Sequence, residues 1–354
     1  MAYTTINKSS DYFNTKLYTG NGSTQSITGV GFQPDWTWIK SRTTTGYHNV
    51  FDAVRGATKR IFTNDTGAEQ TTSNSLTSFD SDGFSLGSNG DVNGNTQNQV
   101  SWNWKAGTGQ GSSNTDGSIN SIATSANATS GFSIVKYTGN GSTNQTIGHG
   151  LGTVPDFVIV KQTNTSRNWP TYSRAMGNGV TFLDITDGFA SGYTNYFYPA
   201  GMTTTTFGIS DNGNINESGG TYIAYVFSSR TGYSKFGKLT SNGSDDGTFT
   251  YTGFAPKWVM LKPSVTDGWS NWYIFDTTRK ENLNDMPLYS NLSTQEGYYG
   301  GSPATDYAQI DILSNGFKIR RGSGWGAGGS GRELIYMSFG QSLVGSNNVP
   351  CTAR

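Results

Sequence analysis

The heptapeptide YTGNGST stands at Tyr18–Thr24 and is spelled identically at Tyr137–Thr143. The resemblance continues past both copies, because ITGVGFQPDWTWIK follows the first and IGHGLGTVPDFVIVK follows the second. A weaker third version, LTSNGSDDGTFTYTGFAPKWVMLK, starts at Leu239. The chain therefore contains three divergent copies of one module of roughly 100–120 residues, much longer than the roughly 20–50 residues of a solenoid unit. A unit of this length can bury a core of its own.

Further landmarks recur in the same order in each copy. FDAVRG at Phe51 is echoed by IFDTTRK at Ile274 and, weakly, by YSRAMG at Tyr172. Each copy also ends on an aromatic stretch: VSWNWKAG, YIAYVFSS and LIYMSFGQ. Each copy also has one proline and one lysine at corresponding positions. The prolines are Pro34, Pro155 and Pro256, and the lysines are Lys40, Lys161 and Lys262.

The short apolar runs predict strands. WTWIK, FVIVK and WVMLK are rich in β-branched and aromatic residues, and FSLG, FGIS and FKIR alternate apolar with polar residues. Helical periodicity is lacking, apart from a turn or two expected near Asp52–Arg60. Many short strands per module favour an all-β protein built from three tandem β-sandwiches, of jelly-roll type or a related one, because antiparallel strands need two packed sheets to bury a face of each.

The repeats and the changes in composition predict six segments. An N-terminal arm and a C-terminal tail enclose three β-sandwich modules, and a Ser/Gly/Asn-rich linker separates the first two. Their ranges are 1–15 for the arm, 16–107 for module one, 108–131 for the linker, 132–230 for module two, 231–343 for module three and 344–354 for the tail.

Composition narrows the choice of partners. Only 14% of the 354 residues are charged and the net charge is zero, while 19 Tyr, 19 Phe and 9 Trp argue against disorder. Without a Lys/Arg-rich run we expect no nucleic-acid partner, and without a long apolar run no membrane insertion. The N-terminus has no secretory-signal pattern, and the single cysteine, Cys351, can form no disulfide within the chain. These features suit a virion protein made in the host cytoplasm.

No residue pattern predicts catalysis, a metal site or a cofactor. His149 and His48 lack a nucleophile motif nearby, and a hydrolase triad is defined by geometry that sequence cannot give. Asp80 and Asp82 lie in an SDG turn, where turn aspartates bind their own backbone. We therefore expect a protein that is not an enzyme, with a polysaccharide-degrading spike as the weakest alternative.

Aromatic and amide-rich loops follow the central strand of each copy. Such loops could contact a sugar or another protein, because aromatic side chains bring a large contact area at a small entropic cost. The alternative is that these residues begin the next strand or fold back over their own sandwich. The candidate ligand-binding residues in these loops are Tyr47, His48, Trp169, Trp269 and Trp272, and a sixth candidate, Trp325, lies at the tip of the Gly-rich hairpin connection Arg320–Glu333.

The stretch GFSIVKYTGNGSTNQTIGHGLGTVPDFVIVK resembles a module of tail-fibre and other structural proteins of tailed bacteriophages, especially those of marine and freshwater bacteria. GFQPDWTWIKSR, FDAVRGATK and LTSFDSDGFSLG look like a sister version, and SLVGSNNVPCTAR is similar to the usual C-terminus of these proteins. The resemblance implies a virion component with a lectin-like β-sandwich, and it assigns no catalytic residue.

Two functional classes follow. The chain is expected to be a tail-associated fibre, spike or baseplate protein that binds a host-surface glycan or receptor, or a capsid decoration or head-fibre protein with a purely architectural role. In both classes we expect a homo-oligomer, with a trimer favoured, that contacts other virion proteins. The polar arms would then become ordered by lying on neighbouring subunits.

Overall fold

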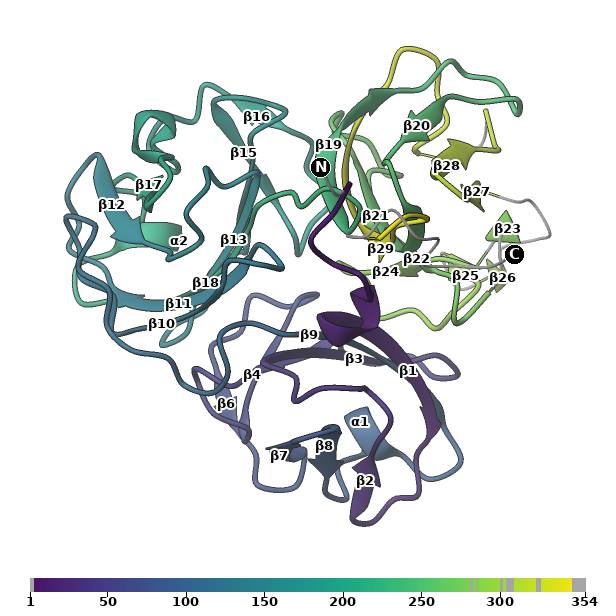
Figure 1. Ribbon diagram of the computed structural model, residues 1–354, viewed down its shortest axis with the longest axis horizontal. Helices are drawn as coiled ribbons and strands as arrows, with labels where there is room; N and C mark the ends of the chain where they lie inside the picture. The colour runs from purple at the N-terminus through teal and green to yellow at the C-terminus, as the bar shows by residue number, and fades with distance from the viewer. Residues whose placement is uncertain are drawn as a thin grey trace.

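The computed structural model describes residues 3–280, 283–284, 286–299, 302–303, 309–322 and 326–345. These residues form three β-rich lobes around a common centre, one lobe for each copy of the repeat (Figure 1). Each lobe carries a larger and a smaller antiparallel sheet, consistent with one β-sandwich module per copy.

Module one forms the lobe at the bottom of Figure 1. Its elements are η1 (Ser9–Asp11), β1 (Phe13–Thr19), β2 (Gln25–Ile27), β3 (Trp36–Ser41), β4 (Asn49–Asp52), β5 (Lys59–Phe62), β6 (Gln70–Thr71), β7 (Leu76–Asp80), β8 (Gly83–Leu86), α1 (Gly90–Asn93) and β9 (Asn98–Trp104). The larger sheet has the strand order β1-β9-β3-β4-β5-β6 and the smaller sheet the order β2-β8-β7. Ile39, Phe51, Phe84 and Leu86 lie buried in the core of this sandwich.

Module two repeats this plan with one strand more in the larger sheet and one strand fewer in the smaller sheet. Its elements are β10 (Ala123–Asn127), β11 (Phe132–Thr138), β12 (Gln145–Gly148), β13 (Phe157–Gln162), β14 (Pro170–Ser173), β15 (Gly179–Phe182), β16 (Ala190–Ser191), η2 (Pro199–Gly201), β17 (Thr206–Ile209), α2 (Gly213–Asn216) and β18 (Thr221–Phe227). The larger sheet has the order β10-β11-β18-β13-β14-β15-β16, and β12 pairs with β17.

Module three has the same core order. Its strands are β19 (Ser234–Thr240), β20 (Phe249–Tyr251), β21 (Ala255–Pro263), β22 (Tyr273–Asp276), β23 (Leu283–Asn284), β24 (Leu288–Tyr289), β25 (Tyr298–Tyr299), β26 (Ser302–Pro303), β27 (Ile310–Leu313), β28 (Gly316–Ile319) and β29 (Glu333–Gln341). The sheets are β19-β29-β21-β22-β24, β20-β28-β27-β23 and the pair β25-β26. Over the described ranges of the whole chain, no helix is long and apolar enough to cross a membrane.

The repeat found in the sequence is therefore a repeat of topology. In each module the last long strand lies between the first strand and the strand that carries the apolar run, giving β1-β9-β3, β11-β18-β13 and β19-β29-β21. The register agrees as well, because Trp36 pairs with Trp104, Phe157 with Phe227, and Trp258 with Phe339.

Both faces of these central strands are covered. Every residue of β3 and of β13 is buried. One face packs on the smaller sheet of the same module, and the other face looks toward the centre of the molecule, where the three modules meet. A strand that is buried on both faces reads as a continuous apolar run, which explains WTWIK and FVIVK.

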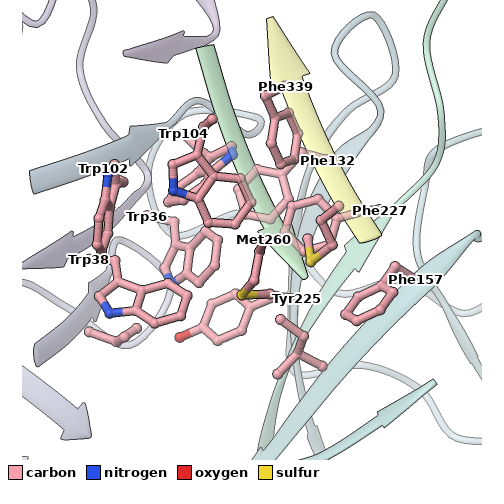
Figure 2. Close-up of a cluster of buried hydrophobic side chains, with 14 of the residues drawn as sticks. Trp36, Trp38, Trp102, Trp104, Phe132, Phe157, Tyr225, Phe227, Met260 and Phe339 are labelled. Carbon is pink, nitrogen blue, oxygen red and sulfur yellow. The ribbon is translucent and has the colours of Figure 1, made fainter. Parts of the chain in front are cut away.

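The residues at this centre form one cluster drawn from all three modules, which we call the central aromatic core. Figure 2 shows Trp36, Trp104, Tyr225 and Phe339 converging there. The Trp36 ring lies 4.3 Å from the Trp104 ring and 4.6 Å from the Tyr225 ring of module two, centroid to centroid. Fully buried aromatic residues contribute about 3–5 kcal/mol each when truncated to alanine. The three modules are thus held as one body by apolar burial.

The YTGNGST loops have a structural role that explains their identity. Gly22 and Gly141 adopt positive φ values of 69° and 72°, which residues with a Cβ rarely adopt. The side chain of Asn93 accepts from the backbone N–H of Asn21, and Asn216 accepts in the same way from Asn140. Each copy of the loop is therefore clamped by an asparagine at the end of a one-turn helix.

Three expectations from the sequence are corrected. No helix forms near Asp52–Arg60, where β4 ends and a turn leads into β5. The N-terminal arm does not need a neighbouring subunit to order it, because Ser9 donates its N–H to the side chain of Gln341 in module three of the same chain (2.7 Å). Residues 123–127 of the expected linker are strand β10, so this part is not a flexible connection.

Candidate functional site

The borders between the modules contain three corresponding lysines, all fully buried. The side chain of Lys161 in module two donates to the Thr66 carbonyl of module one (2.7 Å). Lys262 in module three donates in the same way to the Ile185 carbonyl of module two (3.4 Å). The repeated lysine of the sequence therefore links one module to the preceding one at two of the borders.

Lys40 completes the set at the border of modules three and one. Its ammonium donates to the Ser41 and Thr44 carbonyls of its own module. Burial lowers the pKa of Lys40 to about 8, although the Glu296 carboxylate of module three opposes this shift. Burial likewise lowers the pKa of Lys161 to about 8 and that of Lys262 to about 7. At neutral pH Lys262 is thus the most weakly protonated of the three.

A buried ion pair lies at the border of modules one and two. Arg55 Nε donates to Asp52 Oδ2 (2.5 Å), and Arg55 Nη1 donates to Glu69 Oε2 (3.3 Å). Tyr225 of module two donates its hydroxyl hydrogen to the same oxygen of Asp52 (2.8 Å). We call Asp52, Arg55 and Glu69 the first charged triad.

The border of modules three and one carries the second charged triad, Asp276, Arg279 and Glu296. Arg279 Nε donates to Asp276 Oδ2 (2.5 Å) and Arg279 Nη1 donates to Glu296 Oε1 (2.8 Å). Trp102 of module one donates its indole N–H to Asp276 Oδ2 (3.0 Å). The FDAVR and FDTTR repeats therefore encode the same contact at two borders.

The third border, between modules two and three, has Ser173, Met176 and Phe189 at the corresponding positions. Ser173 pairs with Phe157 in the register in which Asp52 pairs with Trp36. Uncharged side chains therefore replace both the carboxylates and the guanidinium at this border.

The backbone supports this correspondence. The N–H of Phe189 donates to the Ser264 carbonyl of module three (2.7 Å). The N–H of Glu69 donates in the same way to the Thr163 carbonyl of module two (2.8 Å). The N–H of Glu296 in module three donates to the Arg42 carbonyl of module one (3.0 Å). All three borders therefore share a backbone contact, while their side chains differ.

Three of the expected ligand-binding residues lie inside these borders. His48, Trp169 and Trp272 are fully buried, and the backbone N–H of each donates to the side chain of Asn64, Asp184 or Asn291 respectively. The three are corresponding residues of the three modules. Their expected role in a surface loop is therefore wrong, because burial removes them from any ligand in solvent.

The surroundings of His48 are those of a neutral residue in the core. Its Nδ1 accepts from the indole N–H of Trp38 (2.9 Å). Burial lowers the pKa of His48 well below its ordinary value, and the nearby charges of Lys40 and Arg279 lower it further. The Trp169 indole donates to the Asp65 carbonyl of module one (3.2 Å). The Trp169 indole thus joins module two to module one, whereas the hydrogen bond between His48 and Trp38 lies within module one.

The other expected residues are exposed or lie outside the described residues. Tyr47 is 43% exposed and stacks on Phe62, with ring centroids 4.3 Å apart. Trp269 is 48% exposed. Trp325 falls in the range 323–325, outside the described residues.

The carboxylates of the SDG turn serve the backbone and neighbouring hydroxyls. Asp82 accepts from the N–H groups of Gly29 and Gly31, and Asp80 accepts from the hydroxyls of Ser78 and Ser85. Among the described residues no group of three or more His, Cys, Asp or Glu side chains is arranged to hold a metal ion.

A hollow of about 430 Å³ opens beside the border of modules two and three. Its lining includes the aromatic rings of Phe182, Phe189, Tyr193 and Tyr196, together with Asn168, Asp187 and Thr266. Thr266 belongs to module three, and the other lining residues named here belong to module two. Aromatic walls with a few polar groups are typical of sites for small ligands.

Reasoning from sequence missed this hollow. The segment DGFASGYTNYFY contains two of its tyrosines and a Gly-rich turn, which is the kind of signal that marked the other aromatic loops. The segment lies after the second strand of module two's outer hairpin rather than after the central strand. Thr266, which closes the hollow, comes from another module, and a sequence pattern cannot supply that juxtaposition.

One known family spans almost the whole chain. Residues 8–342 match the family described as a domain of unknown function, DUF7483, and the chain belongs to this family. Since the match runs across all three modules, the three-lobed body is the unit that the family describes. No curated protein matches the chain. No solved structure matches it either.

Proposed function

We propose that this chain is a non-enzymatic structural protein of a tailed-bacteriophage virion, associated with the tail as part of a fibre, spike or baseplate, and that it binds a host-surface glycan or receptor. Its modules are then lectin-like sandwiches of the jelly-roll or concanavalin type. The proposal places the protein in the virion after synthesis in the host cytoplasm, with other virion proteins and further copies of itself as partners.

The observation that carries this proposal is the three-lobed body itself. The lobes are joined by a central aromatic core and by buried hydrogen bonds across their borders, while the outer loops carry exposed aromatic side chains such as Tyr47, Tyr193 and Trp269. A rigid support with variable loops suits recognition, because loops can diversify without disturbing the sandwich beneath them. The resemblance to phage tail modules supports the same assignment.

A capsid decoration or head-fibre protein is the alternative. The pseudo-threefold arrangement of Figure 1 favours it, since such a body matches a threefold environment on a symmetric particle. In that case the exposed aromatic residues would contact the particle rather than a host.

The test is immunogold labelling of intact particles with an antibody against the purified chain. Gold at the tail tip or fibres supports the proposal, and gold over the head favours the decoration alternative. Particles that carry no gold, although the antibody recognises the protein after the particles are dissociated, would favour a buried position. A chain that is missing from purified particles by mass spectrometry would contradict the virion assignment.

A further inference from the structure

We propose that the hollow beside the border of modules two and three binds an uncharged pyranose sugar, with Tyr193 as its stacking platform and Asp187 as its main hydrogen-bond acceptor. The inference rests on the proposed function for the idea of a glycan ligand, and it adds the place and the chemistry of binding. The recognition site is then this hollow, whose lining includes Asn168 and Thr266 from two of the loops after the central strands together with Asp187 and Tyr193 from the segment after β15.

The wall of the hollow is built from fixed backbone. The N–H of Gly188 donates to the Thr266 hydroxyl of module three (2.9 Å), and the N–H of Phe189 donates to the Ser264 carbonyl (2.7 Å). The loop from module two is therefore pinned to module three at two successive residues. A pre-formed wall lowers the entropic cost of binding a small ligand.

The aromatic residues form a supported platform. Tyr193 is 53% exposed, whereas Tyr196 is only 7% exposed. The Tyr196 ring lies 6.1 Å from the Tyr193 ring and 5.5 Å from the Phe182 ring, centroid to centroid. An exposed ring that rests against a buried ring offers a flat apolar surface in a defined place, and the C–H face of a pyranose is complementary to such a surface.

Polar groups around the platform are available to a ligand. Asp187 is exposed, and its carboxylate has no hydrogen bond or ion pair with another described residue. The side-chain nitrogen of Asn168 donates to Asp184 (2.8 Å), which leaves the Asn168 amide oxygen as an acceptor. An ionised carboxylate only accepts hydrogen bonds, so it suits the donor hydroxyls of a sugar.

Charge and size restrict the ligand further. The carboxylate of Asp187 lines the hollow, and the buried carboxylate of Asp184 accepts from the lining residue Asn168. The ammonium of Lys262 is buried and donates to the backbone carbonyls of Ile185 and Ser270. An acidic sugar would meet like charge at this position. A volume of about 430 Å³ lies near the lower end of the roughly 300–1,000 Å³ of small-molecule sites, which fits one or two sugar rings.

The test is saturation-transfer NMR on the full-length chain, with glucose, galactose and N-acetylglucosamine as neutral probes and glucuronic acid as the charged comparator. We expect at least one neutral probe to bind with a Kd of about 1 mM. Tyr193→Ala is expected to weaken that binding about tenfold, since it removes the platform. Tyr47→Ala removes a similarly exposed tyrosine elsewhere and is the matched control, with no expected change.

Asp187→Asn provides a second variant that leaves the shape of the hollow unchanged. Weaker binding of the neutral probes, with the melting temperature unchanged, supports the assigned acceptor. Binding that survives both Tyr193→Ala and Asp187→Asn would overturn the site. The site is also rejected if no neutral probe binds, or if glucuronic acid binds more tightly than glucose.

Failure of this inference can be told apart from failure of the proposed function. Particles that carry the protein, together with a purified chain that binds no neutral sugar, overturn the site and leave the virion assignment standing. Sugar binding that is lost in Tyr193→Ala, together with particles that lack the protein, supports the site and rejects the virion assignment.

Discussion

The borders of modules one and two and of modules three and one each bury a charged triad, whereas the border of modules two and three has the uncharged side chains of Ser173, Met176 and Phe189 at the same positions. All three borders keep the backbone contact, the buried lysine and the shared aromatic core. A buried ion pair is weak evidence for stability, because desolvation offsets much of its attraction. The fold therefore tolerates charged or uncharged side chains at these positions, and we expect the triads to contribute specificity to which modules meet.

That specificity has a physical source. Arg55 with Asp52 satisfies the Tyr225 hydroxyl, and Arg279 with Asp276 satisfies the Trp102 indole. The strand position corresponding to these two aromatic residues is Met337 in module three, which has no polar hydrogen to satisfy. At each border the side chains of the two modules therefore match in polarity. Replacing the residues of only one of the two modules would leave a buried polar group unpaired.

The largest effect is expected from breaking one triad. Arg55→Ala leaves Asp52 buried without its cation and should lower the free energy of unfolding by about 3–5 kcal/mol, measured by urea denaturation. Arg279→Ala should behave alike. Met176→Ala at the third border is the matched control, and it should cost only about 1–2 kcal/mol because Met176 is partly buried and uncharged. Equal losses of unfolding free energy in all three variants would contradict the proposed difference between the charged borders and the uncharged border.

The second-largest expected effect is the pH dependence of stability that the buried lysines cause. In the unfolded chain Lys262 has its ordinary pKa of 10.5, and in the folded chain its pKa is about 7. Between these values the unfolded state binds more protons, so stability rises with pH, by about 1 kcal/mol from pH 7 to pH 8. Lys40 and Lys161 add to this slope mainly above about pH 8.

Urea denaturation at pH 6, 7, 8 and 9 measures this dependence. Lys262→Met is expected to remove most of the slope between pH 7 and pH 8, because methionine has no proton to lose. Lys161→Met is the matched control and should keep most of that slope while flattening the curve above pH 8. An unchanged slope in Lys262→Met would show that another group titrates in this range.

A smaller effect is expected from copying the third border onto the first. The combined variant Asp52→Ser, Arg55→Met, Glu69→Phe and Tyr225→Phe replaces the triad by its counterparts and removes the Tyr225 hydroxyl, while it keeps the ring that packs on Trp36. Because a buried ion pair can be exchanged for apolar residues of similar volume at little cost, unfolding free energy should stay within about 1 kcal/mol of the wild type. A loss as large as that of Arg55→Ala would mean that the triad stabilises the border outright.

The smallest effect is expected from protease treatment of the connection between modules one and two. Ile119 is buried and residues 123–127 pair with β11, so limited proteolysis of the folded chain should leave residues 119–127 intact. Mass spectrometry of the fragments checks this. The short connection between modules two and three serves as the comparison. Rapid cleavage within 119–127 would show that the first connection is looser than its pairing indicates.

Much of the fold was readable from the sequence because local pattern and topology agree. The repeat and the short apolar strands follow from patterns that any copy of the module needs. The asparagines that clamp the YTGNGST loops were not predicted, because they lie 72 and 76 residues further along the chain. The prediction of the ligand-binding residues was wrong for three of them, which are buried at the borders between modules. His48, Trp169 and Trp272 stand at corresponding positions, but a pattern of alternating residues does not tell which face of a sandwich another module will cover.

By itself, the sequence determined that the chain is a threefold repeat of an all-β module with neutral, aromatic-rich composition, since repetition and strand periodicity are local properties. Only the tertiary structure decided that the modules close around one aromatic core, that FDAVR and FDTTR bury their charges at borders, and that Tyr193 and Thr266 of another module line one hollow. These are contacts between residues far apart in the chain, and they depend on how whole sheets pack rather than on any short pattern.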